Sequence, residues 1–508
     1  MAGTREGILK KLVAWVLNEP TAIFWLAGMA GTGKTSIAVT LSRMLEKESA
    51  VMMGGGFFCS RSAGSVARTD VRRILPTLAG LLAGKSLEFA RALTVELEED
   101  PRVGHKPVTD QMGPLLRKPL ATLSATTLPL VFVIDALDEC HDQTELAQLI
   151  KDIAEFESDA KVKFILTSRP EMHIRGTPIA DSRFSSILQL HTISEAEVTS
   201  DIRLYIERTL EGCSPDATVW YTTHDIESLI KLASGLFIFA STVLKYIITR
   251  TTVQGRMERL QKATAAVGVG TAATATLDKI YEMIIADASR SDQVDTDELQ
   301  EVKRVLACIL TARTSLSVQA LAELTRTQPS ALRGALERLH SVVYLPSEDV
   351  EPGLRTLHAS FGDFLFDAAR APKDMLIDAA LGDNELAHGC LARMARSDLC
   401  FNISHSESSY RRITQPSQAH WIPLSLIYAC IHWAHHIAVS SDILALEISI
   451  GKYFRPKLLF WLEAMVVLGK VDRSSVLLRI AALAVRIPIL IFLPLILIIL
   501  CNRSKALR

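Results

Sequence analysis

The stretch Gly28-Met-Ala-Gly31-Thr-Gly33-Lys34-Thr35 lies near the start of this chain of 508 residues. A loop that binds phosphate must point several backbone N–H groups inward, and glycines permit that turn where a side chain would clash. The three glycines supply the turn, Lys34 supplies a positive charge for phosphate oxygens, and Thr35 supplies a hydroxyl group for Mg²⁺. The stretch therefore predicts a phosphate-binding loop that takes a nucleotide with Mg²⁺.

The flanks of this loop have the pattern that such a site requires. Ala22–Ala27 is apolar and strand-like, and Ser36–Leu45 has the apolar spacing of a helix. This helix would direct its N-terminus at the phosphates, so Ser36 joins the nucleotide-binding candidates. A dinucleotide-binding loop is the other interpretation of the glycines, but it needs a third glycine where Ser36 stands and has no use for the lysine.

A second motif, Leu130-Val-Phe-Val-Ile-Asp135-Ala-Leu-Asp138-Glu139, predicts an apolar strand that ends in carboxylates. The carboxylate at such a strand end lies beside the phosphate loop, so Asp135 is predicted to hold Mg²⁺ together with Thr35. Asp138 and Glu139 are catalytic candidates that would orient or deprotonate the attacking water. The alternative is that they cap the helix that comes next; catalysis is the favoured interpretation, and the two are compatible.

A third motif, Phe164-Ile-Leu-Thr-Ser-Arg169-Pro, again ends an apolar run with polar residues. Arginine carries a permanent charge and a fork of donors, so Arg169 is predicted to contact the γ-phosphate as a catalytic residue. A surface ion pair is the alternative. No Asn-Lys-x-Asp sequence occurs, so guanine specificity is not indicated and ATP or ADP is the expected nucleotide.

Five apolar runs in the first 190 residues predict a parallel sheet with helices between its strands. The predicted fold class is an α/β P-loop NTPase domain with a five-stranded parallel sheet, followed by all-α helical, winged-helix and C-terminal helical domains. The predicted strands are Ala22–Ala27, Gly54–Cys59, Leu130–Asp135, Lys163–Thr167 and Ser186–Leu190, with helices over Arg68–Ala83 and Thr144–Phe156.

The later part of the chain has a helical pattern. Ser194 is predicted to cap a helix that runs through Thr209, Ile226–Arg250 is predicted as one long helix, and residues 263–276 as a linker. Helices followed by two extended segments between Leu299 and Asp367 predict a winged-helix module. The predicted domains are 1–192 (P-loop NTPase), 193–290 (helical), 291–372 (winged-helix-like), 373–478 (C-terminal helical) and 479–503 (hydrophobic tail).

Composition narrows the function further. Lys plus Arg number 55 and Asp plus Glu 56, and no basic run occurs, so nucleic-acid binding is not predicted. The eight cysteines are scattered without a CxxC pair, which indicates reduced thiols and not a zinc ribbon or a disulfide framework. Lys10 and Lys11 interrupt the apolar N-terminal run, which does not fit a signal peptide. A cytoplasmic protein is therefore expected.

Two C-terminal features remain. His432, His435 and His436 have no carboxylate or cysteine at ligand spacing, so ordinary helix packing is favoured over a metal site.

Ile487–Cys501 has no charge, which is consistent with membrane attachment through residues 480–501. Fifteen helical residues span about 22 Å, short of the hydrocarbon core of roughly 30 Å, so a buried hydrophobic segment is the alternative.

With these motifs in place, the chain resembles NACHT-type STAND P-loop NTPases, and among them the fungal NLR-like group. The resemblance covers most of the chain, although only the phosphate and Mg²⁺ motifs are individually specific. Further matching segments are Gly3-Thr-Arg5-Glu6, Phe24-Trp-Leu26, Ala233-Ser-Gly-Leu-Phe237, Leu277-Asp-Lys-Ile-Tyr281, Leu357-His358-Ala-Ser-Phe-Gly-Asp-Phe-Leu365 and Tyr428-Ala-Cys-Ile-His-Trp433.

The resemblance implies a switch in which the P-loop, helical and winged-helix domains close over ADP and open when ATP replaces it. It implies slow hydrolysis and oligomerisation with identical or related NTPases. It also implies that Arg5 contacts adenine and that His358 contacts the β-phosphate of ADP.

The sequence departs from this group in two respects. The phosphate loop begins at residue 28, so no N-terminal effector domain is expected, and no repeat array is evident. An AAA-like ATPase with steady turnover, and a truncated adaptor or decoy that binds nucleotide without hydrolysis, are therefore the alternatives. A small-molecule kinase is not favoured, because no lid with arginines and no acceptor pocket is indicated.

Overall fold

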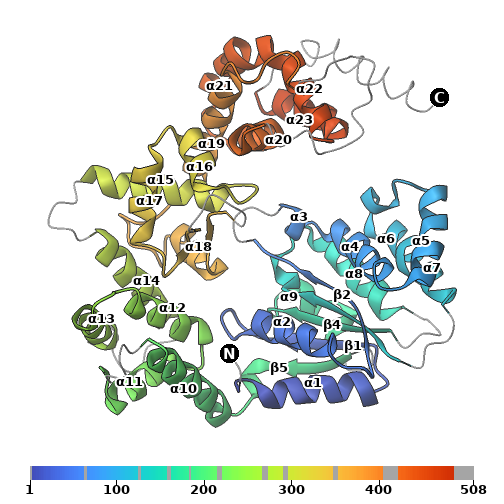
Figure 1. The fold of residues 1–508 in the computed structure, drawn as a ribbon, viewed down its shortest axis with the longest axis vertical. Coiled ribbons are helices and arrows are strands. Elements are labelled where there is room, and N and C mark those ends of the chain that lie inside the picture. The colour runs from blue at the N-terminus through green and yellow to red at the C-terminus, as the bar shows by residue number, and fades with distance from the viewer. Residues whose placement is uncertain are drawn as a thin grey trace. The chain divides into compact units, whose positions relative to one another are not determined.

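The structure is a computed structural model of the whole chain, and its described residues fall into two compact units (Figure 1). The first unit extends to Met283 and the second begins at Ile284. The residues described are 3–61, 66–123, 128–156, 162–181, 185–213, 220–265, 273–289, 296–346, 353–403 and 422–485.

A five-stranded parallel sheet forms the centre of the first unit, as predicted. Its strand order is β2-β3-β4-β1-β5, so β4 lies between the strand before the phosphate loop and the strand that ends in Asp135. The strands β1, β3 and β4 are buried along their whole length, which explains their continuous apolarity. The bounds are β1 Ile23–Ala27, β2 Met52–Phe58, β3 Leu130–Asp135, β4 Val162–Ser168 and β5 Ser185–Gln189.

Helices cover both faces of this sheet (Figure 1). One core joins α1 and α2 to one face, and includes Leu12, Trp15 and Leu41. A larger core joins α4, α5, α6 and α8 to the other face. The bounds are α1 Glu6–Asn18, α2 Lys34–Leu45, α3 Val66–Thr69, α4 Ile74–Ala83, α5 Leu87–Glu99, α6 Val108–Met112, α7 Lys118–Ala121, α8 Gln143–Ala154 and α9 Met172–Arg175.

The helix predicted over Arg68–Ala83 is interrupted. A separate turn, Val71–Arg73, precedes α4, because the Asp70 side chain accepts a hydrogen bond from the Arg72 N–H group and caps this turn.

A group of helices, α10–α13, completes the first unit, and α14 crosses the boundary between the units. Ser194 caps α10 as predicted, by accepting a hydrogen bond from the Glu197 N–H group at 3.2 Å. The bounds are α10 Glu195–Glu211, α11 Thr223–Ala233, α12 Phe237–Ile248, α13 Val253–Ala265 and α14 Ala273–Ser289. Residues 266–272 of the predicted linker lie outside the described residues.

The prediction of one long helix over Ile226–Arg250 is wrong. Ser234 and Gly235 both have positive φ angles, 44° and 79°, which a right-handed helix cannot contain. The chain therefore ends α11 at Ala233 and starts α12 at Phe237. Apolar spacing continues across this break, which is why periodicity alone does not reveal it.

The second unit begins with three helices and a two-stranded antiparallel sheet. An isolated bridge between Leu316 and Leu354 extends the pairing of β6 and β7. Helices, a short pairing segment and a hairpin are the elements that a winged helix contains, and that assignment stays a prediction. The bounds are α15 Thr296–Thr311, α16 Val318–Thr325, α17 Pro329–Glu337, β6 Val343–Tyr344 and β7 Arg355–Thr356.

The remainder of the second unit is helical in its described residues. The helices are α18 Ala359–Phe366, α19 Ala379–Met394, α20 Leu424–Val439, α21 Ile443–Ser449, α22 Leu458–Val467 and α23 Val471–Ala484. The apolar tail after Val485 lies outside the described residues. Among the helices that are described, none combines the length and the apolar character needed to cross a membrane.

A buried polar network joins α19 and α20. The two ring nitrogens of His436 lie 2.6 Å from Asp383 Oδ1 and 2.7 Å from the Tyr428 hydroxyl group. The Tyr428 oxygen also accepts a hydrogen bond from the Arg313 N–H group at 3.0 Å. Burial lowers the pKa of His436, against the opposing charge of Asp383, and it lowers the pKa of His432 well below its ordinary value. These histidines are therefore neutral, structural side chains at neutral pH.

We expect these histidines to make the stability of the protein depend on pH. An unfolded histidine binds a proton near pH 6.5, whereas the buried ones bind it only at lower pH. The contribution of these histidines to the free energy of unfolding is therefore complete above about pH 6.5. It declines as the pH falls, by up to about 1.4 kcal/mol per pH unit for each histidine. Urea unfolding at several pH values between about 7.5 and 5.5 measures this slope.

The variant His436→Gln should flatten the acid slope, and the exposed His224→Gln should leave it unchanged. Equal slopes in all three proteins would show that other groups, such as carboxylates, control the acid sensitivity.

Candidate functional site

The predicted phosphate loop lies between β1 and α2, as the sequence requires. Gly31 and Gly33 have φ angles of 77° and 94°, a left-handed conformation that glycine adopts without strain. Gly33 is the N-cap residue of α2, and Lys34 is the first residue of the helix. The N-terminus of α2 therefore faces the loop, where its N–H groups and its dipole favour an anion.

Lys34 folds back over the loop. Its ammonium group donates hydrogen bonds to the carbonyl oxygens of Gly28 and Met29, at 2.7 and 3.0 Å. Burial lowers the pKa of Lys34, and the charge of Asp138 opposes this shift. An ammonium group has three donors, so these two contacts hold Lys34 in the loop and still allow a bond to a phosphate oxygen.

Asp135 lies at the end of β3 and is 1% exposed. The hydroxyl group of Thr167, from β4, donates to Asp135 Oδ1 at 2.5 Å and accepts the Ala136 N–H group at 2.9 Å. Burial raises the pKa of Asp135, while the Thr167 and Thr35 hydroxyl groups and the charge of Lys34 oppose the rise. Thr167 thus fixes the carboxylate across the strand that separates it from the phosphate loop.

The second oxygen of this carboxylate fits a metal ion. Asp135 Oδ2 is buried and has no hydrogen-bond partner among the described residues. A carboxylate oxygen near a threonine hydroxyl group is the donor set that Mg²⁺ takes at nucleotide sites. Thr35 and Asp135 would therefore hold Mg²⁺, where it would neutralise charge on the phosphates.

Asp138 and Arg169 form an ion pair at the ends of neighbouring strands. Asp138 Oδ1 accepts the Arg169 N–H group at 2.8 Å, and Oδ2 lies 3.1 Å from Arg169 Nε. The Asp138 side chain is 4% exposed and that of Arg169 25%. The two predicted catalytic residues therefore contact each other, and the Asp138 carboxylate is occupied by a cation.

Glu139 and Asp138 lie in a short turn, Leu137–Glu139, and not in a helix cap. The cap of α8 is Asp142, whose side chain accepts hydrogen bonds from the Thr144 and Glu145 N–H groups. The capping interpretation of Asp138 and Glu139 is therefore wrong. Glu139 accepts the Arg61 N–H group at 2.7 Å, and burial raises the pKa of Glu139, with the Arg61 bond acting against it.

Arg5 connects the loop to the helices α10 and α12. It is 6% exposed, and its guanidinium donates to the Thr32 carbonyl oxygen at 3.2 Å. The same group lies 3.8 Å from an Asp201 oxygen on α10 and 4.8 Å from the centre of the Phe237 ring on α12. Burial lowers the pKa of Arg5, and Asp201 opposes this shift.

A second contact joins α12 to the phosphate loop. The Ile238 N–H group, in the first turn of α12, donates to the Gly31 carbonyl oxygen at 3.1 Å. A Cβ atom at Gly31 would overlap the Ile238 side chain, so this close approach requires glycine. The helices after the sheet thus contact the backbone of the loop directly.

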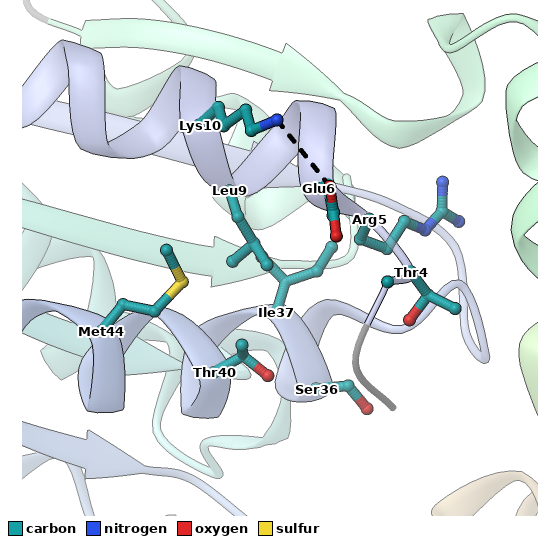
Figure 2. Close-up of a pocket in the computed structure, with 10 residues that line it drawn as sticks. Thr4, Arg5, Glu6, Leu9, Lys10, Ser36, Ile37, Thr40 and Met44 are labelled. Atoms are coloured by element: carbon teal, nitrogen blue, oxygen red, sulfur yellow. Dashed lines mark ion pairs between the residues drawn. The ribbon is translucent and has the colours of Figure 1, made fainter.

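A cavity of about 360 Å³ lies between the start of α1 and one side of α2, from Ser36 in its first turn to Met44 in its last (Figure 2). Figure 2 shows Leu9 from α1 and Ile37 from α2 extending toward one another, with Ser36 and Thr40 on α2 beside them. Its wall is therefore partly apolar with a few polar groups, the character of small-molecule sites. The lining residues are Gly3, Thr4, Arg5, Glu6, Leu9, Lys10, Ser36, Ile37, Thr40 and Met44.

His358 lies in the second unit as the N-cap residue of α18. Its Nδ1 accepts the Ser360 N–H group at 3.0 Å, and lies 2.7 Å from the Ser360 hydroxyl oxygen. Because Nδ1 accepts from a backbone N–H group, the proton of the neutral ring is on Nε2. A phosphate bond from His358 would have to come from Nε2.

The family model named "Nephrocystin 3, N-terminal" matches residues 3–169. No curated protein matches the chain. The assignment rests on three features of the first unit: its parallel strands, the left-handed glycine loop at the start of α2, and Asp135 on β3, with β4 between that strand and β1. The first unit has the P-loop NTPase fold.

The solved structures that match the chain resemble it only distantly. A Signal Transduction ATPase with Numerous Domains (STAND) protein with a tetratricopeptide repeat sensor, from Pyrococcus horikoshii, is 13% identical, with a TM-score of 0.38; 94% of this chain and 64% of that chain are covered. Cdc6p from Pyrobaculum aerophilum is 11% identical, with a TM-score of 0.33; 70% of this chain and 90% of that chain are covered. At such scores these likenesses carry no argument, and the fold assignment rests on the features of the first unit.

Three features of the P-loop NTPase site were not predicted. The Thr167 hydroxyl group is the bridge to Asp135, and Ile238 closes on Gly31. The thiols of Cys59 and Cys140 lie 3.4 Å apart in the interior, which raises the pKa of Cys59. The role of Thr167 could have been predicted, because it is a polar residue at the end of an apolar run. Nothing in the spacing of the two cysteines indicates their contact.

The variant Asp135→Asn tests the proposed Mg²⁺ ligand. We expect nucleotide affinity with Mg²⁺ to fall to the affinity measured in EDTA, because an amide is a poorer Mg²⁺ ligand than a carboxylate. Titration with a fluorescent ATP analogue, with and without Mg²⁺, measures this. Asp142→Asn is the matched control, since asparagine also caps helices. A Mg²⁺ effect that persists in Asp135→Asn would remove Asp135 from the metal site.

The variant Arg5→Met tests the contact between the loop and the later helices. It removes the cation beside Asp201, which keeps only the hydrogen bond from the N–H group of residue 5, and it removes the guanidinium donor to the Thr32 carbonyl oxygen. We therefore expect the free energy of unfolding to fall by about 2–4 kcal/mol. Nucleotide affinity should fall with it, because the loop backbone loses a support. Lys11→Met, on the helix α1 that follows Arg5, is the control, since that side chain is exposed and does not line the cavity. Equal losses in the two variants would contradict the role of Arg5.

Proposed function

We propose that this protein is an ATP- and ADP-binding signal-transduction switch of the NACHT or STAND type. In this proposal hydrolysis is slow, and exchange of the nucleotide opens the domains and permits oligomerisation. The observation that carries it is the direct contact between the phosphate loop and α12, in which Ile238 donates to the Gly31 carbonyl oxygen.

This contact links nucleotide state to helix position. The loop that would bind phosphates with its N–H groups also accepts hydrogen bonds at the carbonyl oxygens of Gly31 and Thr32. Donors to these oxygens come from Ile238 on α12 and from Arg5, which itself contacts α10 and α12. A shift in the loop backbone therefore changes the bonds that hold these helices, which is the coupling a switch needs.

In this proposal, different residues around the loop bind different parts of the nucleotide. Gly28, Gly31 and Gly33 provide the turn for the phosphates, Lys34 provides the charge, and Thr35 would hold Mg²⁺ with Asp135. Ser36 lies at the N-terminus of α2, on the side of the cavity in Figure 2. That cavity is close to the loop and partly apolar, so it suits the ribose and base of the same nucleotide.

The geometry around Asp138 favours slow hydrolysis over steady turnover. A general base must reach the attacking water with a free carboxylate, but Asp138 is bound by the backbone and the guanidinium of Arg169. Arg169 would have to exchange Asp138 for the γ-phosphate before either residue could act. Glu139, whose pKa is raised by burial, is then the remaining candidate for the base.

The resemblance extends the proposal to the second unit and to partners. His358 would contact the β-phosphate of ADP in the closed state through Nε2, and the module around it would be a winged helix. Identical or related NTPases would be the partners, in the cytoplasm, and no nucleic acid is expected. These expectations come from the resemblance of the sequence to the fungal NLR-like group. A steadily working AAA-like ATPase and an adaptor without hydrolysis are the rival functions.

Analysis of the nucleotide that is retained by the purified full-length protein distinguishes these functions. We expect close to one ADP per chain, and a turnover far below about 1 s⁻¹ when ATP is supplied. Lys34→Ala should lose the nucleotide, because the loop then lacks its phosphate-binding charge. Lys47→Ala, an exposed lysine just after α2, should retain it.

Rapid multiple turnover by the wild-type protein would contradict the switch and support the steady ATPase. Bound nucleotide that is never hydrolysed, even in a single turnover, would support the adaptor. A wild-type protein that neither retains nor binds nucleotide would overturn all three.

A further inference from the structure

The side chain of Trp25 makes a buried hydrogen bond close to the phosphate loop. Its indole N–H group, on β1, donates to the hydroxyl oxygen of Ser168, the last residue of β4, at 2.8 Å. Trp25 is 2% exposed and Ser168 is 0% exposed, so both partners of this bond are shielded from water. A buried polar group without a partner destabilises a fold, so each of these two side chains depends on the other.

The backbone of Ser168 also holds the first residue of the phosphate loop. Its carbonyl oxygen accepts the Gly28 N–H group at 3.1 Å, which continues the pairing of β1 with β4 by one residue beyond Ala27. The Gly28 carbonyl oxygen in turn accepts a hydrogen bond from the ammonium group of Lys34 at 2.7 Å. A chain of three hydrogen bonds therefore leads from the indole of Trp25 to the lysine of the loop.

The residues on either side of Ser168 belong to the same site. Thr167 donates to Asp135 on β3 at 2.5 Å, and Arg169 is the predicted contact of the γ-phosphate. Successive side chains of a strand point to opposite faces of the sheet, so the bonds of Thr167 and Ser168 cross to β3 on one face and to β1 on the other. The end of β4 is therefore fixed from both faces.

We propose that Trp25 is a positioning residue for nucleotide binding, and that it acts on the phosphate loop through Ser168. Trp25 lies in the core between the sheet and the helices α4, α5, α6 and α8, and it does not line the cavity beside α2, so its effect on the ligand is indirect. The indole bond fixes the end of β4, and this end fixes Gly28. The inference rests on the proposed function only in that the loop binds a nucleotide, and it applies equally to a switch and to a steady ATPase.

The dissociation rate of a fluorescent ADP analogue from the full-length protein, chased with unlabelled ADP, tests this inference. Trp25→Phe keeps an aromatic ring but lacks the N–H donor, so we expect dissociation to accelerate by about three- to tenfold, the range of one hydrogen bond. Ser168→Ala removes the acceptor with little change in volume and should have the same effect, which gives a second test if Trp25→Phe does not fold. The double variant should be no faster than either single variant, because all three lack the same bond.

Trp15→Phe is the matched control. The Trp15 indole also donates to hydroxyl groups, those of Thr21 at 2.8 Å and Ser186 at 3.1 Å, and the side chain is 3% exposed. These partners lie at the starts of β1 and β5, at the opposite end of the strands from the loop. Trp15→Phe should therefore lower the urea midpoint of unfolding, as Trp25→Phe does, and leave the dissociation of the analogue unchanged.

Equal dissociation rates in Trp25→Phe and the wild-type protein, or in Trp25→Phe and Trp15→Phe, would overturn the inference, because Trp25 would then contribute to stability alone. Accelerations that multiply in the double variant would also overturn it, since Trp25 and Ser168 would then act by separate routes. A wild-type protein that binds no nucleotide would be a different failure: it would overturn the proposed function, and with it the inference that rests on it.

Discussion

The close approach of Ile238 to Gly31 is the constraint on which the rest of the site depends. Backbone can approach backbone here only because Gly31 has no side chain and adopts a positive φ angle. The same conformation turns the loop's N–H groups toward the place of a phosphate and its carbonyl oxygens toward α12. The carbonyl oxygen of Gly31 accepts the Ile238 N–H group, and Arg5 adds a second contact at the neighbouring carbonyl oxygen of Thr32. These contacts are the basis of the coupling between nucleotide and helices that we propose.

The ionisable groups of the site are buried, and burial shifts their pKa values toward the uncharged forms. Burial raises the pKa of Asp135 and Glu139 and lowers that of Lys34, so each charged group is less stable here than it would be in water. A nucleotide with Mg²⁺ brings both signs of charge into the same space and would compensate these groups. Until then the charges compensate one another locally, as in the pair of Asp138 and Arg169. This pairing is the physical basis of the slow hydrolysis that we propose.

Much of the first unit was predictable because its signals are local. Buried parallel strands are continuously apolar, and Leu130–Asp135 was predicted with its observed bounds. The Ser194 cap was predicted because a serine side chain bonds an N–H group three residues later, whatever the rest of the fold does. The prediction of one long helix over Ile226–Arg250 was wrong because Ser234 and Gly235 both have positive φ angles, which break a helix without changing the apolar spacing around it.

The sequence by itself determined the phosphate loop, the sheet strands and the identity of the Mg²⁺ candidates, because glycine geometry and apolar runs depend on neighbours in the chain. Only the tertiary structure decided the strand order that puts Thr167 between the loop and Asp135, and the pairing of Asp138 with Arg169. It also decided that Ile238 and Arg5 meet at the loop, so that Gly28–Thr35 is in contact with the helices that follow the sheet. Such contacts join residues separated by 27 to 207 positions, and sequence spacing carries no information on pairs that only folding brings together.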